Sequence, residues 1–131
     1  MKTILFACTE NRKRSKIAEA VFNHLANAKD IDMRAISAGT APASEVDPLV
    51  TQILSEKGVV ASPKKPQQLT DELLEKADRI VSFGCLIPDM FPKDKFEEWR
   101  VDDPETPEEY QEVFQIIFER VEGLLQKTDS R

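Results

Sequence analysis

The sequence predicts an α/β protein in which a doubly wound parallel sheet carries helices on both faces. Short apolar segments typical of buried strands alternate along the chain with longer segments whose apolar residues recur at helical spacing. The 131 residues suffice for one domain, and 40% hydrophobic with 32% charged residues is ordinary for a globular protein. The chain contains no repeat, low-complexity stretch or linker, so we expect residues 1–131 to form a single domain.

Four segments are predicted as strands. The first is short, apolar and uncharged after Lys2, as expected for a strand that is buried on both faces. Gly84 ends the third segment, because glycine interrupts a strand pattern. The predicted strands cover residues 2–7, 33–37, 79–83 and 99–101.

Helical spacing and capping residues predict the helices that follow each strand. Ile17, Val21 and Leu25 form one stripe, which is typical of a helix that packs one face on a sheet. Thr106 and Glu109 form a capping box, the sequence signature of a helix N-terminus. The predicted helices cover residues 15–28, 48–58 with Asp47 as N-cap, 70–77 with Thr70 as N-cap, and the chain from Thr106 onward.

Composition excludes several classes of protein. The net charge of −6 argues against a nucleic-acid partner. The longest uncharged apolar run, residues 3–9, is far shorter than the roughly 20 residues that cross a bilayer. No signal-peptide pattern opens the chain, so we expect a cytoplasmic protein without a membrane partner, whose two cysteines are reduced thiols. The chain has one histidine, His24, which argues against a metal site and against a Ser-His-Asp hydrolase. Its four glycines are too widely spaced for a nucleotide-binding loop. We therefore expect no metal and no cofactor.

The segment between the first predicted strand and helix indicates an oxyanion site. Cys8 directly follows the strand and Arg14 comes six positions later. A helix N-terminus and neighbouring cations there favour a thiolate. Successive backbone N–H groups bind a tetrahedral oxyanion, and an arginine can hold two of its oxygens. We predict that Cys8 attacks phosphorus or arsenic. The predicted oxyanion-binding residues are Thr9, Glu10, Asn11, Arg12, Lys13, Arg14 and Ser15, with Ser15 as the helix N-cap. The alternative is a buried cysteine beside a solvated basic loop.

Asp102 and Asp103 follow the fourth predicted strand. Ligands of parallel sheets bind at the C-terminal ends of the strands, so this pair is expected near Cys8. A displacement reaction needs an acid that protonates the leaving oxygen, and a carboxyl group on a separate loop can supply it. Spacing alone leaves open which aspartate is the acid, and a solvated acidic turn is the alternative.

Together these residues resemble the low-molecular-weight protein tyrosine phosphatase superfamily, which includes the thioredoxin-type arsenate reductases. The resemblance covers nearly the whole chain, and its motifs are Ile4-Leu5-Phe6-Ala7-Cys8, Arg14-Ser15, Ala18-Glu19-Ala20, Ser37-Ala38-Gly39-Thr40 and Asp103-Pro104. It implies a flavodoxin-like sheet of four parallel strands. By this resemblance Cys8 is the nucleophile, Arg14 the oxyanion clamp, Asp103 the general acid, Asn11 the residue of a left-handed turn, and Ser15 the group that steadies the thiolate.

Two features look more like the reductase branch: the stretch of residues 96–104 and a cysteine, Cys85, after the third predicted strand. The resemblance then implies that arsenate forms a covalent adduct on Cys8. Cys85 attacks this adduct, which releases arsenite and leaves a Cys8–Cys85 disulfide. The expected partners are arsenate or phosphate as the oxyanion, and thioredoxin, glutaredoxin or a small thiol as the reductant. We also expect a monomer.

Several residues depart from the superfamily pattern. The sequence has no third cysteine to pass the disulfide to a reductant, Glu10 stands where the phosphatases usually have glycine, and Lys13 where many have cysteine. Arsenate reduction is therefore the leading interpretation, and hydrolysis of phosphotyrosine through a phosphocysteine on Cys8 is the alternative. A third hypothesis is a catalytically weak oxyanion-binding protein. In the last two cases Cys85 can be a small apolar residue at a strand end.

Overall fold

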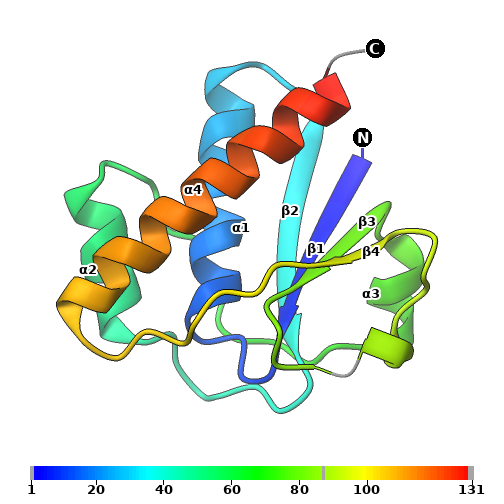
Figure 1. Ribbon diagram of the computed structural model, residues 1–131, viewed down its shortest axis with the longest axis horizontal. Helices are drawn as coiled ribbons and strands as arrows, with labels where there is room; N and C mark the ends of the chain where they lie inside the picture. Colours follow the sequence, from blue (N-terminus) through cyan, green and yellow to red (C-terminus); the bar gives the residue numbers. More distant parts are fainter. Residues whose placement is uncertain (1, 87, 130–131) are drawn as a thin grey trace.

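A sheet of four parallel strands lies at the centre of the computed structural model, which describes residues 2–86 and 88–129 (Figure 1). The strands are β1 (Lys2–Cys8), β2 (Met33–Gly39), β3 (Arg79–Ser82) and β4 (Phe96–Glu98), in the spatial order β2-β1-β3-β4. All neighbouring strands in this sheet pair in parallel. The predicted fold class is confirmed.

Helices cover both faces of the sheet. They are α1 (Arg14–Ala28), α2 (Pro48–Glu56), α3 (Asp71–Lys76) and α4 (Pro107–Asp129), with a short 3₁₀ helix, η1 (Pro88–Met90). In Figure 1, α4 crosses α1 to the left of the strands, α2 lies further to the left, and α3 lies apart on the right beside β3. This arrangement brings the C-terminal ends of the strands together at the lower edge of the sheet, where β1 leads into α1.

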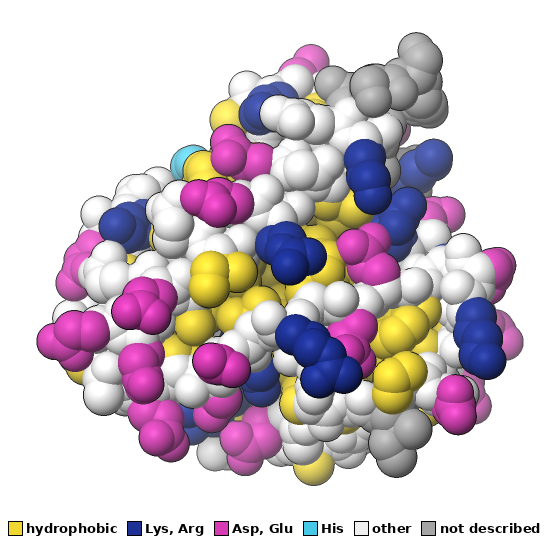
Figure 2. Space-filling view, viewed as in Figure 1, with side chains coloured by type: hydrophobic (Ala, Val, Ile, Leu, Met, Phe, Trp, Pro, Cys, Tyr) yellow, Lys and Arg dark blue, Asp and Glu magenta, His cyan; other side chains and the backbone are white. Residues whose placement is uncertain are grey.

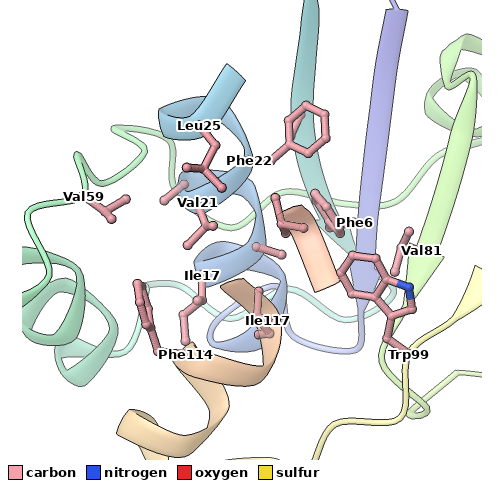
Figure 3. Close-up of a cluster of buried hydrophobic side chains, with 14 of the residues drawn as sticks. Phe6, Ile17, Val21, Phe22, Leu25, Val59, Val81, Trp99, Phe114 and Ile117 are labelled. Atoms are coloured by element: carbon pink, nitrogen blue, oxygen red, sulfur yellow. The ribbon is translucent and has the colours of Figure 1, made fainter. Parts of the chain in front are cut away.

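Alternation of side chains along β1 builds two separate cores. Ile4 and Phe6 point into the larger cluster with α1, α2 and α4, whereas Leu5 and Ala7 point into the smaller cluster beside α3. Phe6 lies at the centre of the larger cluster, with its ring centroid 5.8 Å from that of Trp99 (Figure 3). Because β1 is buried on both faces, the end of this strand, and hence Cys8, is fixed from both sides.

The fourth strand differs from the prediction. It comprises residues 96–98, and the predicted segment 99–101 lies beyond it, although the Trp99 N–H still donates to Ser82 O at 2.8 Å. The buried–exposed–buried pattern of residues 99–101 imitates a strand, but it arises because Trp99 and Val101 pack into the core from a connecting segment. The other strand boundaries differ from the prediction by one or two residues.

The caps predicted for α2, α3 and α4 are confirmed. The Asp47 side chain accepts the Leu49 N–H at the start of α2, and Thr70 caps α3 in the same way. At the start of α4 the capping box forms: the Glu109 carboxylate accepts the N–H groups of Glu105 and Thr106 at 2.9 and 3.1 Å. The Thr106 hydroxyl accepts the Glu109 N–H at 3.2 Å.

We expect Glu109→Gln to lower the free energy of unfolding at neutral pH but not in acid. Hydrogen bonds from the backbone of Glu105, and then of Thr106, lower the pKa of Glu109 below its ordinary 4.5. A carboxylate with a lowered folded-state pKa stabilises the fold above its unfolded pKa, and this stabilisation disappears as the pH falls through the folded value. Urea denaturation at neutral pH and at about pH 3 measures the difference.

Glu108→Gln is the matched control, since it removes one charge from the same turn at an exposed side chain. Equal effects of the two substitutions, or an effect of Glu109→Gln that persists unchanged in acid, would contradict the prediction.

Candidate active site

The chain turns from β1 into α1 through a loop that is held by Asn11. This residue is fully buried and has a φ of 52°, a left-handed conformation that asparagine tolerates better than most residues. Its side-chain oxygen accepts the Gln67 N–H at 3.0 Å, and its amide group donates to Ser15 Oγ at 2.8 Å. The left-handed turn expected at Asn11 is therefore present, and two distant segments fix it.

The loop turns its carbonyl groups away from its own interior. N–H groups of the segment 40–47 donate to the carbonyl oxygens of residues 8, 9, 10 and 12 at distances between 2.8 and 3.3 Å. The N–H groups of the loop are thus available on the opposite side, where that of Asn11 donates to Cys8 Sγ at 3.2 Å. A ring of inward N–H groups is a binding site for an anion.

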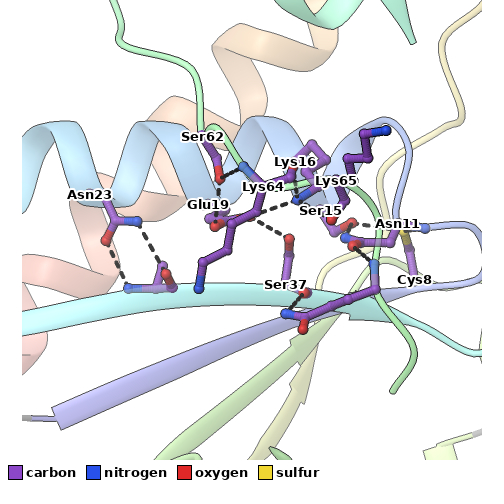
Figure 4. Close-up of polar contacts among 12 residues, drawn as sticks. Cys8, Asn11, Ser15, Lys16, Glu19, Asn23, Ser37, Ser62, Lys64 and Lys65 are labelled. Carbon is purple, nitrogen blue, oxygen red and sulfur yellow. Dashed lines mark hydrogen bonds and ion pairs between the residues drawn. The ribbon is translucent and has the colours of Figure 1, made fainter. Parts of the chain in front are cut away.

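Cys8 lies at the bottom of this loop with 5% of its surface exposed. Its Sγ atom shares a hydrogen bond of 2.9 Å with the Ser15 hydroxyl (Figure 4). The prediction that Ser15 is the helix N-cap is wrong: α1 begins at Arg14, Lys13 is its N-cap, and no side chain caps it. The Ser15 hydroxyl is directed at the sulfur and at Asn11 instead, so it is not available to the helix end.

Arg14 connects the loop to the other strand ends. Its Nη1 donates to Val101 O at 2.6 Å and to Phe83 O at 3.3 Å, and its Nε lies 3.9 Å from Asp103 Oδ1. These bonds hold the planar guanidinium beside Cys8, where both residues line one cavity of about 150 Å³. The described residues that line this cavity are Cys8, Thr9, Glu10, Arg12, Lys13, Arg14 and Asp103.

The structure distinguishes the two adjacent aspartates by position. Asp103 lines the cavity, half-exposed, and its Oδ2 lies 3.3 Å from Lys13 Nζ. Lys13 also donates to Pro104 O at 2.9 Å, so it ties the Asp103 loop to the oxyanion loop. Asp102 is exposed and is not among the lining residues that the structure describes.

Positive charge at the site is less concentrated than the sequence indicates. Arg12 Nη2 lies 3.3 Å from Asp47 Oδ2, and Lys13 and Arg14 both face Asp103. Each cation of the loop therefore has a carboxylate partner from elsewhere in the chain. Glu10 is exposed at the cavity and does not form the Arg12 pair, which belongs to Asp47. Figure 2 shows many further acidic side chains over α2 and the start of α4.

Cys85 lies after β3, beside the strand that carries Cys8. Ala7 pairs with Ser82, so Cys8 and Cys85 follow neighbouring strands at the same end of the sheet. Both cysteines are free thiols, and Cys85 is half-buried against the hydrophobic cluster that includes Cys8. Cys85 does not line the cavity among the residues described.

A buried polar network supports the loop from behind and was not predicted. Lys16 and Glu19 are 3% and 4% exposed and form an ion pair of 3.4 Å in α1 (Figure 4). Glu19 also accepts the hydroxyls of Ser37 and Ser62, and Lys16 donates to Lys64 O at 3.0 Å. The network fixes the segment that leads to Gln67 and Asn11. A charged pair at i,i+3 among apolar helix residues was the available signal.

The sequence matches the family described as "Low molecular weight phosphotyrosine protein phosphatase" over residues 3–131. The chain belongs to this family. Among curated relatives, the glutaredoxin arsenate reductase of Synechocystis sp. is 28% identical over 97% of this chain and 98% of its own length. The protein-arginine-phosphatase of Bacillus subtilis is 35% identical over 60% of this chain and 53% of its own length.

Solved structures agree with this membership. The thioredoxin-dependent arsenate reductase Cg_ArsC1' of Corynebacterium glutamicum is 33% identical with a TM-score of 0.82, over 97% of this chain and 61% of that protein. A low molecular weight phosphotyrosine phosphatase of Vibrio cholerae O395 has a TM-score of 0.90 over 99% of this chain and 98% of its own, and at 23% identity it shows the fold alone. This member of the low-molecular-weight phosphatase family is therefore an enzyme, grouped with arsenate reductases and protein phosphatases.

The described part of the chain has neither a membrane-spanning helix nor a cluster of metal ligands. No helix among them is long and apolar enough to cross a membrane. No group of three or more His, Cys, Asp or Glu side chains in the same part of the chain could hold a metal ion.

We expect Gly39→Ala to distort the oxyanion loop. A Cβ atom at Gly39 would lie 2.5 Å from Thr9 O and 2.9 Å from Asn11 N, closer than a Cβ atom approaches backbone atoms in proteins. The substitution should cost about 1–3 kcal/mol of stability and weaken the binding of inorganic phosphate. Thermal unfolding and calorimetric titration measure the two effects.

Gly123→Ala provides the matched control in α4, because nothing lies within 4 Å of its added Cβ. It should stabilise the protein by about 0.5–1 kcal/mol and leave phosphate binding unchanged. If Gly39→Ala behaved like Gly123→Ala, the close packing of the loop on β2 would not matter for binding.

Proposed function

We propose that the protein is a thiol-dependent arsenate reductase with Cys8 as the nucleophile. The observation that carries this proposal is the lining of the cavity over Cys8. None of the lining residues described there is aromatic or aliphatic; beside Cys8 and Thr9 they are charged. A phosphotyrosine ring needs apolar surface to pack against, whereas a free oxyanion needs only hydrogen-bond donors and cations.

In the first step, arsenate binds the N–H groups of the oxyanion loop and the Arg14 guanidinium. The Cys8 thiolate attacks arsenic, an S–As bond forms, and one oxygen leaves as water. Asp103 supplies the proton for this oxygen. The position of this half-exposed carboxyl group at the cavity that contains Cys8 supports the role.

In the second step, the Cys85 thiolate attacks Cys8 Sγ. An S–S bond forms as the S–As bond breaks, and the electron pair of that bond stays on arsenic. Arsenic(V) is thereby reduced to arsenic(III), which leaves as arsenite, and the two thiols are oxidised to one disulfide. The position of the two cysteines after neighbouring strands, against one hydrophobic cluster, supports this step.

The disulfide must then be reduced by two electrons from an external thiol. Since the sequence has only two cysteines, the reductant attacks the Cys8–Cys85 disulfide directly. The names of the relatives, a glutaredoxin and a thioredoxin-dependent arsenate reductase, support these two proteins as candidates beside a small thiol. We expect the thiol of the reductant to attack Cys85, because it is the more exposed of the two cysteines.

Phosphomonoester hydrolysis is the second candidate function. The oxyanion loop, Arg14 and Asp103 contain the groups that a phosphocysteine mechanism uses, and the family description supports it. This reaction needs no second cysteine, so it makes a different prediction for Cys85. A catalytically weak oxyanion-binding protein is a third candidate, supported by the pairing of each loop cation with a carboxylate.

We expect Cys85→Ser to abolish arsenate reduction and to spare hydrolysis of an aryl phosphate, because only reduction needs the second sulfur. Cys8→Ser should abolish both reactions. Arsenite formation with glutaredoxin, thioredoxin or glutathione, and release of nitrophenol, measure the two activities. Equal arsenate turnover by wild type and Cys85→Ser would reject the reductase, and binding of phosphate with neither turnover would favour the binding protein.

We expect Asp103→Asn to lower the turnover number by about 10²–10⁴-fold, the usual contribution of a general acid. Asp102→Asn removes the same charge one residue away and should change turnover less than about threefold. Single-turnover kinetics of arsenate consumption compare the two variants. Similar losses in both would mean that the acid is supplied by another group.

A further inference from the structure

Tyr110 presents an unpartnered hydroxyl group behind the oxyanion loop. The residue lies in α4, is 1% exposed, and its hydroxyl has no hydrogen-bond partner of good geometry in the described part of the chain. The Asp47 carboxylate is nevertheless close to it. Burial, then the charge of Asp47 and a weak hydrogen bond toward that carboxylate, raise the pKa of Tyr110 above its ordinary range. The charge of Asp103 raises it less strongly, and the charge of Arg12 lowers it. A buried hydroxyl without a partner is costly and needs an explanation.

Asp47 is shared between the start of α2 and the oxyanion loop. Its Oδ1 accepts the Leu49 N–H at 2.9 Å and thereby caps the helix. Its Oδ2 faces Arg12 Nη2 at 3.3 Å, and its own N–H donates to Arg12 O at 3.2 Å. One carboxylate oxygen is therefore committed to the helix, and the other holds an arginine that lines the cavity over Cys8.

We propose that Asp47 exchanges Arg12 for Tyr110 when an oxyanion enters the cavity. Without an anion, Arg12 pairs with Asp47 and the Tyr110 hydroxyl has no hydrogen bond of good geometry. With an anion, the Arg12 guanidinium turns to the bound oxygens, and the Tyr110 hydroxyl donates to the freed Asp47 Oδ2. Asp47 and Tyr110 are positioning residues, and Arg12 is a second guanidinium at the site beside Arg14.

The exchange has a physical reason at each position. If Arg12 moved away and no other group replaced it, the partly buried Asp47 carboxylate would lose its partner. The free-energy cost of this unpaired carboxylate opposes the movement. A hydroxyl donor waiting beside that carboxylate removes most of this cost. The inference deepens the proposed function, and rests on it only in taking the loop after β1 as an oxyanion site.

The test uses inorganic phosphate as the probe, with affinity measured by isothermal titration calorimetry on the full chain. Arg12→Gln should weaken phosphate binding about tenfold, because a charge-assisted hydrogen bond is lost. Tyr110→Phe should weaken it about threefold or more. The same substitution should leave the free energy of unfolding without anion unchanged or higher, because it removes an unpaired buried hydroxyl.

Double variants separate the exchange from a general packing effect. Tyr110→Phe should have no effect on phosphate binding in an Arg12→Gln background, since no arginine is left to release. It should also have none in an Asp47→Asn background, where asparagine keeps the cap of α2 but not the carboxylate. Unchanged affinity in Tyr110→Phe alone, or the same loss in either background, would overturn the exchange.

Arg14→Gln distinguishes this inference from the proposed function. It should abolish measurable phosphate binding if the loop is the oxyanion site. If it does not, the proposed function fails together with the exchange. If it does, and Tyr110→Phe leaves the affinity unchanged, only the exchange fails.

Discussion

The site depends on one constraint: between β1 and α1, the carbonyl groups of residues 8, 9, 10 and 12 are turned toward the segment 40–47. The hydrogen bonds that hold them require β2 and its extension to run against the loop, and the approach is so close that Gly39 leaves no room for a side chain. Once the carbonyls are committed, the N–H groups can only face inward, where Cys8 lies. The arrangement that we propose as an anion site is thus a consequence of sheet packing.

Features of the fold and the site could be predicted from the sequence where they depend on residues close together in the chain. Cys8 and Arg14 lie in one short segment between a strand and a helix, so the order of residues is enough to propose an oxyanion loop. The choice of Asp103 over Asp102 needs the Lys13 contact, which joins residues ninety positions apart. The fourth strand was misplaced because burial of Trp99 and Val101 by α4 and the core imitates the alternation of a strand. An alternation of apolar and polar residues indicates which side chains are buried, but a connecting segment can bury its side chains as a strand does.

The balance of charge at the site shows the same limit. Arg12, Lys13 and Arg14 are consecutive, and the sequence therefore indicates a strongly positive loop. Their partners, Asp47 and Asp103, come from the segments after β2 and β4. An anion that enters does not meet three free cations but competes with carboxylates for them. Competition of this kind lowers affinity and raises discrimination, because only a ligand with several oxygens in the right directions can replace several contacts at once.

Arg14 couples binding to the arrangement of the other reacting groups. Its Nη1 bonds to Phe83 O, two residues before Cys85, and to Val101 O, two residues before Asp103. The guanidinium that we propose binds the oxyanion therefore also holds the segments that carry Cys85 and Asp103. If a covalent adduct on Cys8 shifts this guanidinium, the shift would also move both segments, because a single hydrogen bond joins each of them to Arg14. For the same reason, an Arg14 variant loses more than one contact to the anion, since the neighbouring strand ends lose the group that holds them together.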